Sequence, residues 1–179
     1  MSSFTRSLVM LLLGLSVSAC DIVNINDRLL NSSDRRITQF ETRPNAMAWA
    51  SVPGQSAVME RRIGNEVEQV ISLPNSTAIP GDNQLLMRAS RTGRQAAGRL
   101  RLEALRARIG GFPEPFTSVR AQDMMTSEDT LGPYSWVARS FGQANCVLAV
   151  RKLDAEARPI PAGRNALEVV LRNCVSGPH

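Results

Sequence analysis

Tyr134-Ser-Trp-Val-Ala-Arg-Ser-Phe141 and Cys146-Val-Leu-Ala-Val-Arg-Lys-Leu153 are two runs of strand length, and Gly142-Gln-Ala-Asn145 separates them. Both runs are rich in β-branched and aromatic residues, and a short connection that contains glycine is typical of a β-hairpin. A third such run, residues 166–172, follows a connection rich in proline and glycine. The C-terminal third of the chain therefore predicts a β-hairpin that a third strand extends into a meander.

Two more segments upstream have the pattern of strands. In residues 67–73, apolar side chains alternate with polar ones apart from the extra Val70, and residues 84–89 form an apolar run after a Pro-Gly turn. The short apolar runs 47–52 and 57–59 flank another Pro-Gly turn, which predicts either two short strands or one strand and an irregular link. These segments favour antiparallel pairing, since turns and loops connect them.

One segment has helical periodicity. Between Gly98 and Gly110, the apolar residues Leu102, Leu105 and Ile109 recur at the spacing of one helix face. Glycines and a proline end the pattern, and the polar stretch that follows predicts a loop or a short helical turn. The expected fold class is therefore α+β: a mainly antiparallel sheet with a C-terminal β-hairpin or meander and one amphipathic helix packed on it.

The N-terminus has the pattern of an export signal. Arg6 precedes an apolar run from Leu8 to Leu15, and small residues lead to Cys20. The run is too short to span a bilayer, which needs about 20 apolar residues. The tetrapeptide Val17-Ser-Ala-Cys20 resembles a bacterial lipobox, in which the cysteine receives a diacylglycerol before cleavage. The alternative is an ordinary signal peptide cleaved after Ala19, which leaves Cys20 as a free thiol.

Three regions follow from this interpretation. Residues 1–19 are a lipoprotein signal peptide, residues 20–45 are a lipidated N-terminus with a polar tether, and residues 46–179 are a single small α+β domain. Several acyl chains on one cysteine hold a protein stably on a membrane. We therefore expect a membrane-anchored lipoprotein of the cell envelope that faces the periplasm, with the choice between inner and outer membrane left open.

The remaining cysteines, Cys146 and Cys174, are expected to form a disulfide. Disulfides persist in an oxidising compartment, and a meander brings these two residues close together.

The residues of common catalytic sites are scarce. The single histidine, His179, is the last residue, so histidine catalysis and zinc binding lose support, and no Gly-Lys-Ser/Thr phosphate loop occurs. The acidic pairs Glu128/Asp129 and Asp154/Glu156 have the residue types of glycosidase carboxylates, but those need a defined separation across a cleft, and solvated loop charges are the better interpretation. We therefore expect a non-enzymatic protein with no cofactor, no metal ion and no nucleic-acid partner.

Two groups of side chains are candidates for contact with a partner. Arg94, Arg101 and Arg108 recur every seventh residue, and arginine suits phosphate and carboxylate groups. The alternative is an exposed helix face whose stems cover the sheet edge. Tyr134 and Trp136 share one strand face and are candidates for glycan contact, although rings on a half-covered sheet also serve as core.

Four segments together resemble the cellulose biosynthesis protein BcsN family. They are Gln69–Asn83, Leu131–Ala138, Ala144–Arg151 and Val170–Cys174, in this order and spacing. The resemblance implies an accessory protein that acts beside a bacterial cellulose synthase and its export machinery, and it supplies no active site. The chain departs from the family pattern in ending soon after the last strand and in a region around Trp136 that is less aromatic.

The functional hypothesis is a periplasmic lipoprotein that assists cellulose or other exopolysaccharide synthesis or export. Its expected partners are the membrane, through the lipid, proteins of the synthase and export complex, and the polysaccharide itself. The alternative is a structural envelope lipoprotein that binds peptidoglycan or a secretion-system partner through its arginines. An enzyme that acts on the glycan is a third class, and it would need two carboxylates placed across a cleft.

Overall fold

A computed structural model describes residues 36–91, 100–155 and 157–177 of the 179-residue chain. The expected signal peptide, Cys20 and most of the expected tether lie outside these residues, as does Arg94. Residues 37–179 form one compact unit, which is the part described below. Among the helices of the described segments, none is both long and apolar enough to cross a membrane.

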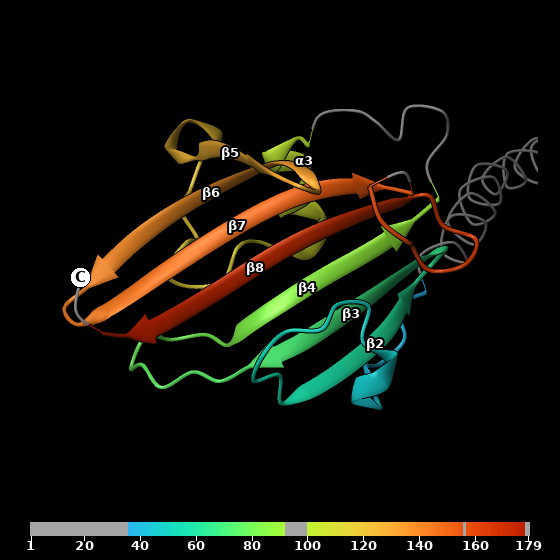
Figure 1. Cartoon of the computed structure of the whole chain (residues 1–179), viewed down its shortest axis with the longest axis horizontal. Coiled ribbons are helices and arrows are strands. Elements are labelled where there is room, and N and C mark those ends of the chain that lie inside the picture. The colour runs from blue at the N-terminus through green and yellow to red at the C-terminus, as the bar shows by residue number, and fades with distance from the viewer. Residues whose placement is uncertain (1–35, 92–99, 156, 178–179) are drawn as a thin grey trace, which may run out of the picture. The chain divides into compact units, whose positions relative to one another are not determined.

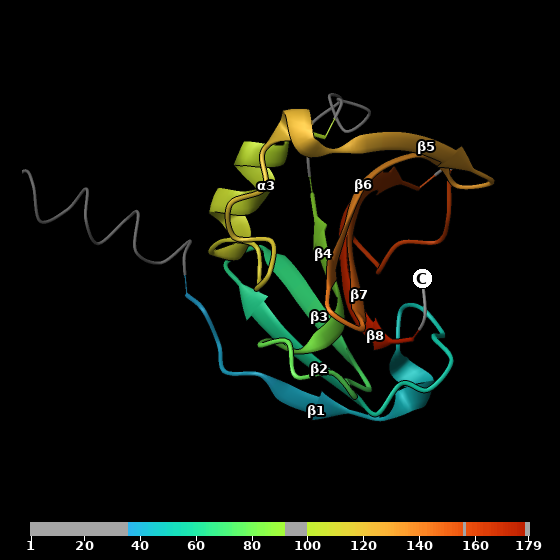
Figure 2. The same ribbon diagram turned by 90° about the vertical axis from the view of Figure 1, so that its left-hand side faces the viewer.

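Eight antiparallel strands form one strongly curved sheet (Figures 1 and 2). The strands are β1 (Glu41–Arg43), β2 (Ala57–Ile63), β3 (Glu66–Leu73), β4 (Asn83–Ser90), β5 (Met125–Asp129), β6 (Gly132–Phe141), β7 (Ala144–Asp154) and β8 (Ala166–Ser176). Their order across the sheet is β1-β2-β3-β4-β8-β7-β6-β5. The sheet as a whole is not a hairpin meander, because the last strand, β8, lies between β4 and β7.

The helices of the described residues are few and short. They are α3 (Leu102–Ile109) and the 3-10 turns η1 (Asn45–Met47) and η2 (Ala121–Asp123). The α+β class is therefore confirmed, although α3 has only eight residues. It ends where expected, at Gly110, whose φ of 82° is left-handed.

The C-terminal hairpin forms as its two strand-length runs and the short connection with Gly142 predicted. β6 and β7 pair from Phe141↔Ala144 to Ser135↔Val150, and Gly142, with a φ of 60°, turns the chain between them. β7 then pairs with β8 along its whole length, which places Cys146 opposite Cys174. Their Cα atoms are 4.0 Å apart and the predicted disulfide is present.

Two strands were not predicted. β5 replaces the loop or helical turn that its polar residues indicated, and β1 lies in the sheet although residues 20–45 were expected to be a tether. The domain thus begins before residue 46, and Ile37 already forms a bridge with Ile63. Both strands lie at the edges of the sheet, where exposed polar residues replace the alternating pattern that identifies a half-buried strand.

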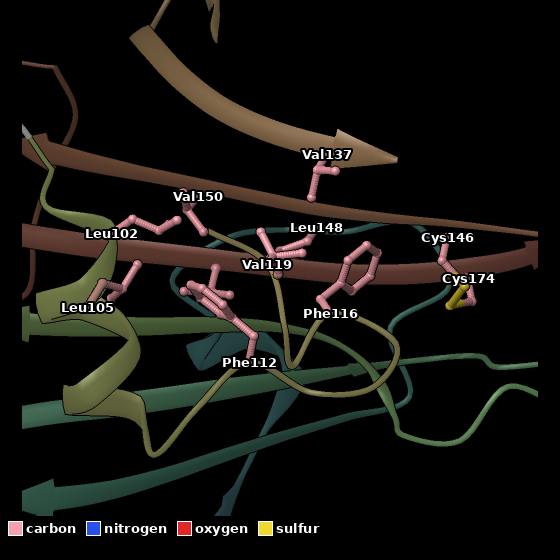
Figure 3. Close-up of a cluster of buried hydrophobic side chains, with 11 residues drawn as sticks. Leu102, Leu105, Phe112, Phe116, Val119, Val137, Cys146, Leu148, Val150 and Cys174 are labelled. Carbon is pink, nitrogen blue, oxygen red and sulfur yellow. A yellow bond between two sulfur atoms is a disulfide. The ribbon is translucent and has the colours of Figure 1, made fainter. Parts of the chain in front are cut away.

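The core lies on the helix face, the sheet face that carries Leu86, Leu148 and Val170. Leu102 and Leu105 of α3 pack there, and Ile109 packs against them as the helical spacing predicted. The segment after α3 adds Phe112, Phe116 and Val119 (Figure 3). Figure 3 also places the disulfide at the end of this cluster beside Phe116.

The opposite face, with Leu85, Ala149 and Leu171, is called the groove face. Part of it is covered by two segments around Trp49 and Ile160, which pack on a second core cluster that includes Met87 and Leu167. The side chains nearer to β6 remain half-buried.

Candidate functional site

An apolar groove lies on the groove face, with a volume of about 250 Å³. Strand alternation and register assemble it, because Trp136 lies opposite Ala149, Ala149 opposite Leu171, and Leu171 opposite Leu85. Ala149 is the smallest member of this row, and it lines the groove together with Leu85, Leu171 and Tyr134.

Tyr134 and Trp136, the predicted aromatic pair, lie next to each other on this face at the side of the groove. The Arg151 guanidinium lies 5.2 Å from the centre of the Tyr134 ring. The Trp136 indole N–H donates to Ser127 Oγ on β5 at 3.0 Å. Both rings are therefore held in fixed orientations while remaining partly exposed.

A charged pair forms the rim of the groove beside Tyr134. Arg151 donates from both terminal nitrogens to Asp129, at 3.1 and 2.7 Å, and also to the Gly132 carbonyl at 2.7 Å. Asp129 accepts in addition from the Leu131 N–H at 2.8 Å. These hydrogen bonds, first the one from Arg151, lower the pKa of Asp129. Asp129 is therefore ionised at neutral pH and serves as an acceptor rather than as a general acid.

Of the two acidic pairs, Glu128/Asp129 lies within the described residues. Glu128 and Asp129 are consecutive on β5, so their side chains point to opposite faces of the sheet. Glu156, of the other pair, lies outside the described residues. No group of three or more His, Cys, Asp or Glu side chains suited to a metal ion occurs in the described ranges.

The predicted arginine surface is divided by the structure. Arg101 is exposed, whereas Arg108 donates to Glu168 at 2.9 Å and to Glu66 at 3.0 Å. Arg108 thus fixes α3 to the sheet, a use that its helical spacing did not reveal. Arg94 is outside the described residues.

Arg108 belongs to an ionic cluster beneath α3, with members Arg61, Glu66, Glu68, Arg88, Arg108 and Glu168. Glu68 is fully buried and accepts from Arg61 Nε at 2.7 Å and from Arg88 Nε at 3.0 Å. Arg88 also donates to the Arg108 carbonyl, at 2.8 Å. Burial raises the pKa of Glu168, which Arg108 opposes, and its Oε2 has no hydrogen-bond partner in the described structure.

A second buried polar group lies at the other end of β8. Asn83 Nδ2 donates to the Cys174 carbonyl and its Oδ1 accepts from the Cys174 N–H, both at 2.7 Å. The amide thereby continues the β4–β8 ladder beyond its last pair, Gln84↔Arg172. The Arg172 guanidinium is buried against the same Asn83 Oδ1 at 2.6 Å.

The sequence-based interpretation missed Arg151, Asn83 and Arg172, and it treated Asp129 as a solvated loop charge, whereas Asp129 accepts two hydrogen bonds from Arg151. Alternation places Arg151 on the same face as Leu153, which is a usable signal, but its position beside Tyr134 follows from the register of three strands. Nothing in the local sequence links Asn83 with Arg172, since 89 residues separate them.

No family model, curated protein or solved structure matches this chain.

Proposed function

We propose that this protein is a non-enzymatic, lipid-anchored periplasmic protein that assists the synthesis or export of a bacterial exopolysaccharide, with cellulose as the specific polymer. The export signal, the lipobox-like Cys20 and the resemblance to the BcsN family support the envelope location and the process. One structural observation supports direct contact with the polymer: Tyr134 and Trp136 lie side by side next to an apolar groove with a charged rim.

The chemistry of the groove suits a β-linked glucan. Such a chain has flat faces of C–H groups and edges of equatorial hydroxyls. The faces pack on aromatic and aliphatic side chains, which Trp136, Tyr134 and Leu171 supply. The hydroxyls need fixed donors and acceptors, which Arg151 and Asp129 supply at the rim.

The test is retention of the purified mature protein on insoluble cellulose. Trp136→Ala and Tyr134→Ala are expected to reduce retention at least tenfold, because each substitution removes an aromatic ring on which a sugar face would pack. Phe141→Ala is the matched control, because Phe141 is an exposed ring on the same strand but on the opposite face. Far-UV circular dichroism confirms that each variant is folded.

If Trp136→Ala and Tyr134→Ala are retained on cellulose as well as the control Phe141→Ala, the groove is refuted as the contact site. Retention on peptidoglycan but not on cellulose would instead support the alternative, a structural envelope lipoprotein. In cells, deletion of the gene in a cellulose-producing strain is expected to lower dye-measured cellulose output, and unchanged output would refute the accessory role.

The anchor is tested separately with Cys20→Ser. The substitution is expected to abolish labelling by a radioactive fatty acid and to leave the Cys146–Cys174 bridge intact, since the two features involve different cysteines. Labelling that survives the substitution would refute Cys20 as the lipidated residue.

A further inference from the structure

The outer edge of β5 has no partner strand among the described residues. β5 is the last strand of the sheet, and it pairs with β6 alone (Figure 2). Asp129 lies opposite Gly132 across a two-residue turn, so this pair exchanges backbone hydrogen bonds, and such pairs alternate along an antiparallel ladder. Thr126 and Glu128 therefore direct their N–H and C=O groups away from β6.

Other contacts of β5 agree with this orientation. Pro133 lies opposite Glu128, and proline has no N–H group to donate to the Glu128 carbonyl. Within the described segments, neither Thr126 nor Glu128 forms a backbone hydrogen bond outside the ladder. All residues of β5 except Ser127 are exposed, so other described segments leave the strand uncovered. The edge therefore offers two N–H and two C=O groups to a further strand.

β5 lacks several features that usually prevent an edge strand from pairing. Natural edge strands are often interrupted by proline, by lysine or by a bulge. β5 contains neither residue type, and its register with β6 is continuous over all five residues. The opposite edge, β1, has only three residues, and its Arg43 is paired with Glu41 and Glu60. β5 is therefore the edge better suited to pairing with another strand.

The backbone of β5 complements a second copy of itself in one antiparallel register. When Ser127 lies opposite Ser127 of the second copy, each Thr126 lies opposite Glu128 of the other copy. The outward N–H and C=O groups then face each other, and all five positions of β5 are paired. Registers centred on Thr126 or on Glu128 pair only three positions of the strand.

The charges of β5 favour the same register. Glu128 lies opposite the Thr126 hydroxyl of the second copy, whereas a register centred on Glu128 would place two carboxylates directly opposite each other, which is destabilising. Asp129 lies opposite Met125, and Arg151 already compensates its charge at 2.7 Å. Met125 is 49% exposed, and the second strand would cover part of its side chain.

We infer that β5 is a self-association edge, through which two copies of this chain pair across a two-fold axis at Ser127. The axis is perpendicular to the sheet, so the groove faces of both copies lie on the same side. Tyr134 and Trp136 lie on β6, one strand from the edge. Three strand spacings, about 14 Å, then separate the two β6 strands. The dimer thus carries two aromatic pairs on one continuous face.

The use of this face for a glycan rests on the proposed function, since a polymer that contacts both aromatic pairs would bind more tightly than one that contacts a single pair. The interface itself is small. A five-residue edge buries less than the roughly 1,200 Å² of a standard interface, and weak association is therefore expected. A covalent trap is the suitable assay for such a pair.

The direct test is disulfide trapping in the purified protein that carries Cys20→Ser and retains the Cys146–Cys174 bridge. Ser127→Cys places two thiols opposite each other, with Cα atoms about 4.5 Å apart, which a disulfide can span. Thr126→Cys is the matched control, because its two copies would lie two residues out of register, about 8 Å apart, which is too far. Mild oxidation is expected to give at least tenfold more covalent dimer with Ser127→Cys, and equal yields would overturn the inference.

A second measurement adds Thr126→Pro to the Ser127→Cys chain. Proline is tolerated on an edge strand where the N–H faces solvent, and it removes a donor that the pairing needs, so the yield of covalent dimer should fall at least tenfold. Thr126→Val keeps the N–H and is the control. An unchanged yield with proline would overturn the inference. If the dimer is trapped but the wild-type protein is not retained on cellulose, the glycan contact fails and the self-association edge stands.

Discussion

Replacement of Arg172 by methionine tests the buried polar group that joins β8 to the loops around it. Arg172 lies on the helix face and is fully buried. Its Nε donates to the Glu114 carbonyl at 3.0 Å, its Nη1 to Asn83 Oδ1 at 2.6 Å and its Nη2 to the Pro80 carbonyl at 2.8 Å. One side chain therefore connects three segments that are far apart in the sequence.

The magnitude follows from the acceptors that methionine leaves behind. Three oxygens lose a hydrogen bond from a charged donor, and each such bond contributes about 1.5–3 kcal/mol. Asn83 Oδ1 keeps the Cys174 N–H as a donor, and water can reach the exposed residues Glu114 and Pro80, so the loss is smaller than the sum of the three bonds. Removal of the guanidinium offsets part of this loss, because burial also disfavours the charge, as the lowered pKa of Arg172 indicates. The balance predicts a loss of about 2–3 kcal/mol. The free energy of unfolding of a typical domain is about 5–15 kcal/mol.

Urea unfolding followed by tryptophan fluorescence, with the disulfide intact, measures this change as a shift in midpoint at constant slope. The control is Arg120→Met, since the Arg120 side chain is 64% exposed and surface changes usually stay within about 0.5 kcal/mol. Arg172→Lys keeps the charge but lacks the planar fork of donors, and it should remain destabilised. A loss below about 1 kcal/mol for Arg172→Met, or full recovery with lysine, would refute this account.

Three further perturbations have expected outcomes. Cys146→Ser/Cys174→Ser opens a 28-residue separation and should lower the free energy of unfolding by about 3.6 kcal/mol in the chain-entropy model; no shift of the urea midpoint would contradict it. Burial raises the pKa of Glu168 in the folded state above its value in the unfolded state, so the folded state binds more protons. The free energy of unfolding of the wild type therefore falls as the pH rises from the unfolded-state pKa through the folded-state pKa. Glu168→Gln lacks this titration, so the stability of the variant relative to wild type should improve across that window, and a constant difference would argue against it. Gly81→Ala should destabilise more than Gly132→Ala in the same assay, because φ is similar (96° and 93°) but the added Cβ at Gly81 lies 3.4 Å from a carbonyl oxygen; equal losses would mean that this close approach has no effect.

Local patterns predicted α3 and the strands that carry alternating apolar residues. Such patterns report burial on one face, and burial is what β6, β7, β8 and α3 share. β1 and β5 escaped because an edge strand of exposed polar residues has no such period. The order of the sheet also escaped, since the insertion of β8 beside β4 depends on pairing between distant segments.

The candidate site was predictable to the extent that it depends on a single strand. Alternation placed Tyr134 and Trp136 on one face, but the groove beside them needs Ala149 and Leu171 at matching register. Arg108 shows that a local spacing pattern can also predict the wrong environment for a side chain. Its seven-residue spacing predicted a free basic surface, whereas two carboxylates from distant strands bind it.

The two faces of the sheet leave different side chains accessible. On the helix face, α3 and the segment that follows it cover the apolar residues. On the groove face, the segments around Trp49 and Ile160 pack on the second core cluster, whereas Tyr134 and Trp136 stay partly exposed. A ligand that packs on the rings of β6 would therefore contact the groove face, and Phe141, an exposed ring on the opposite face of the same strand, would not take part in that contact.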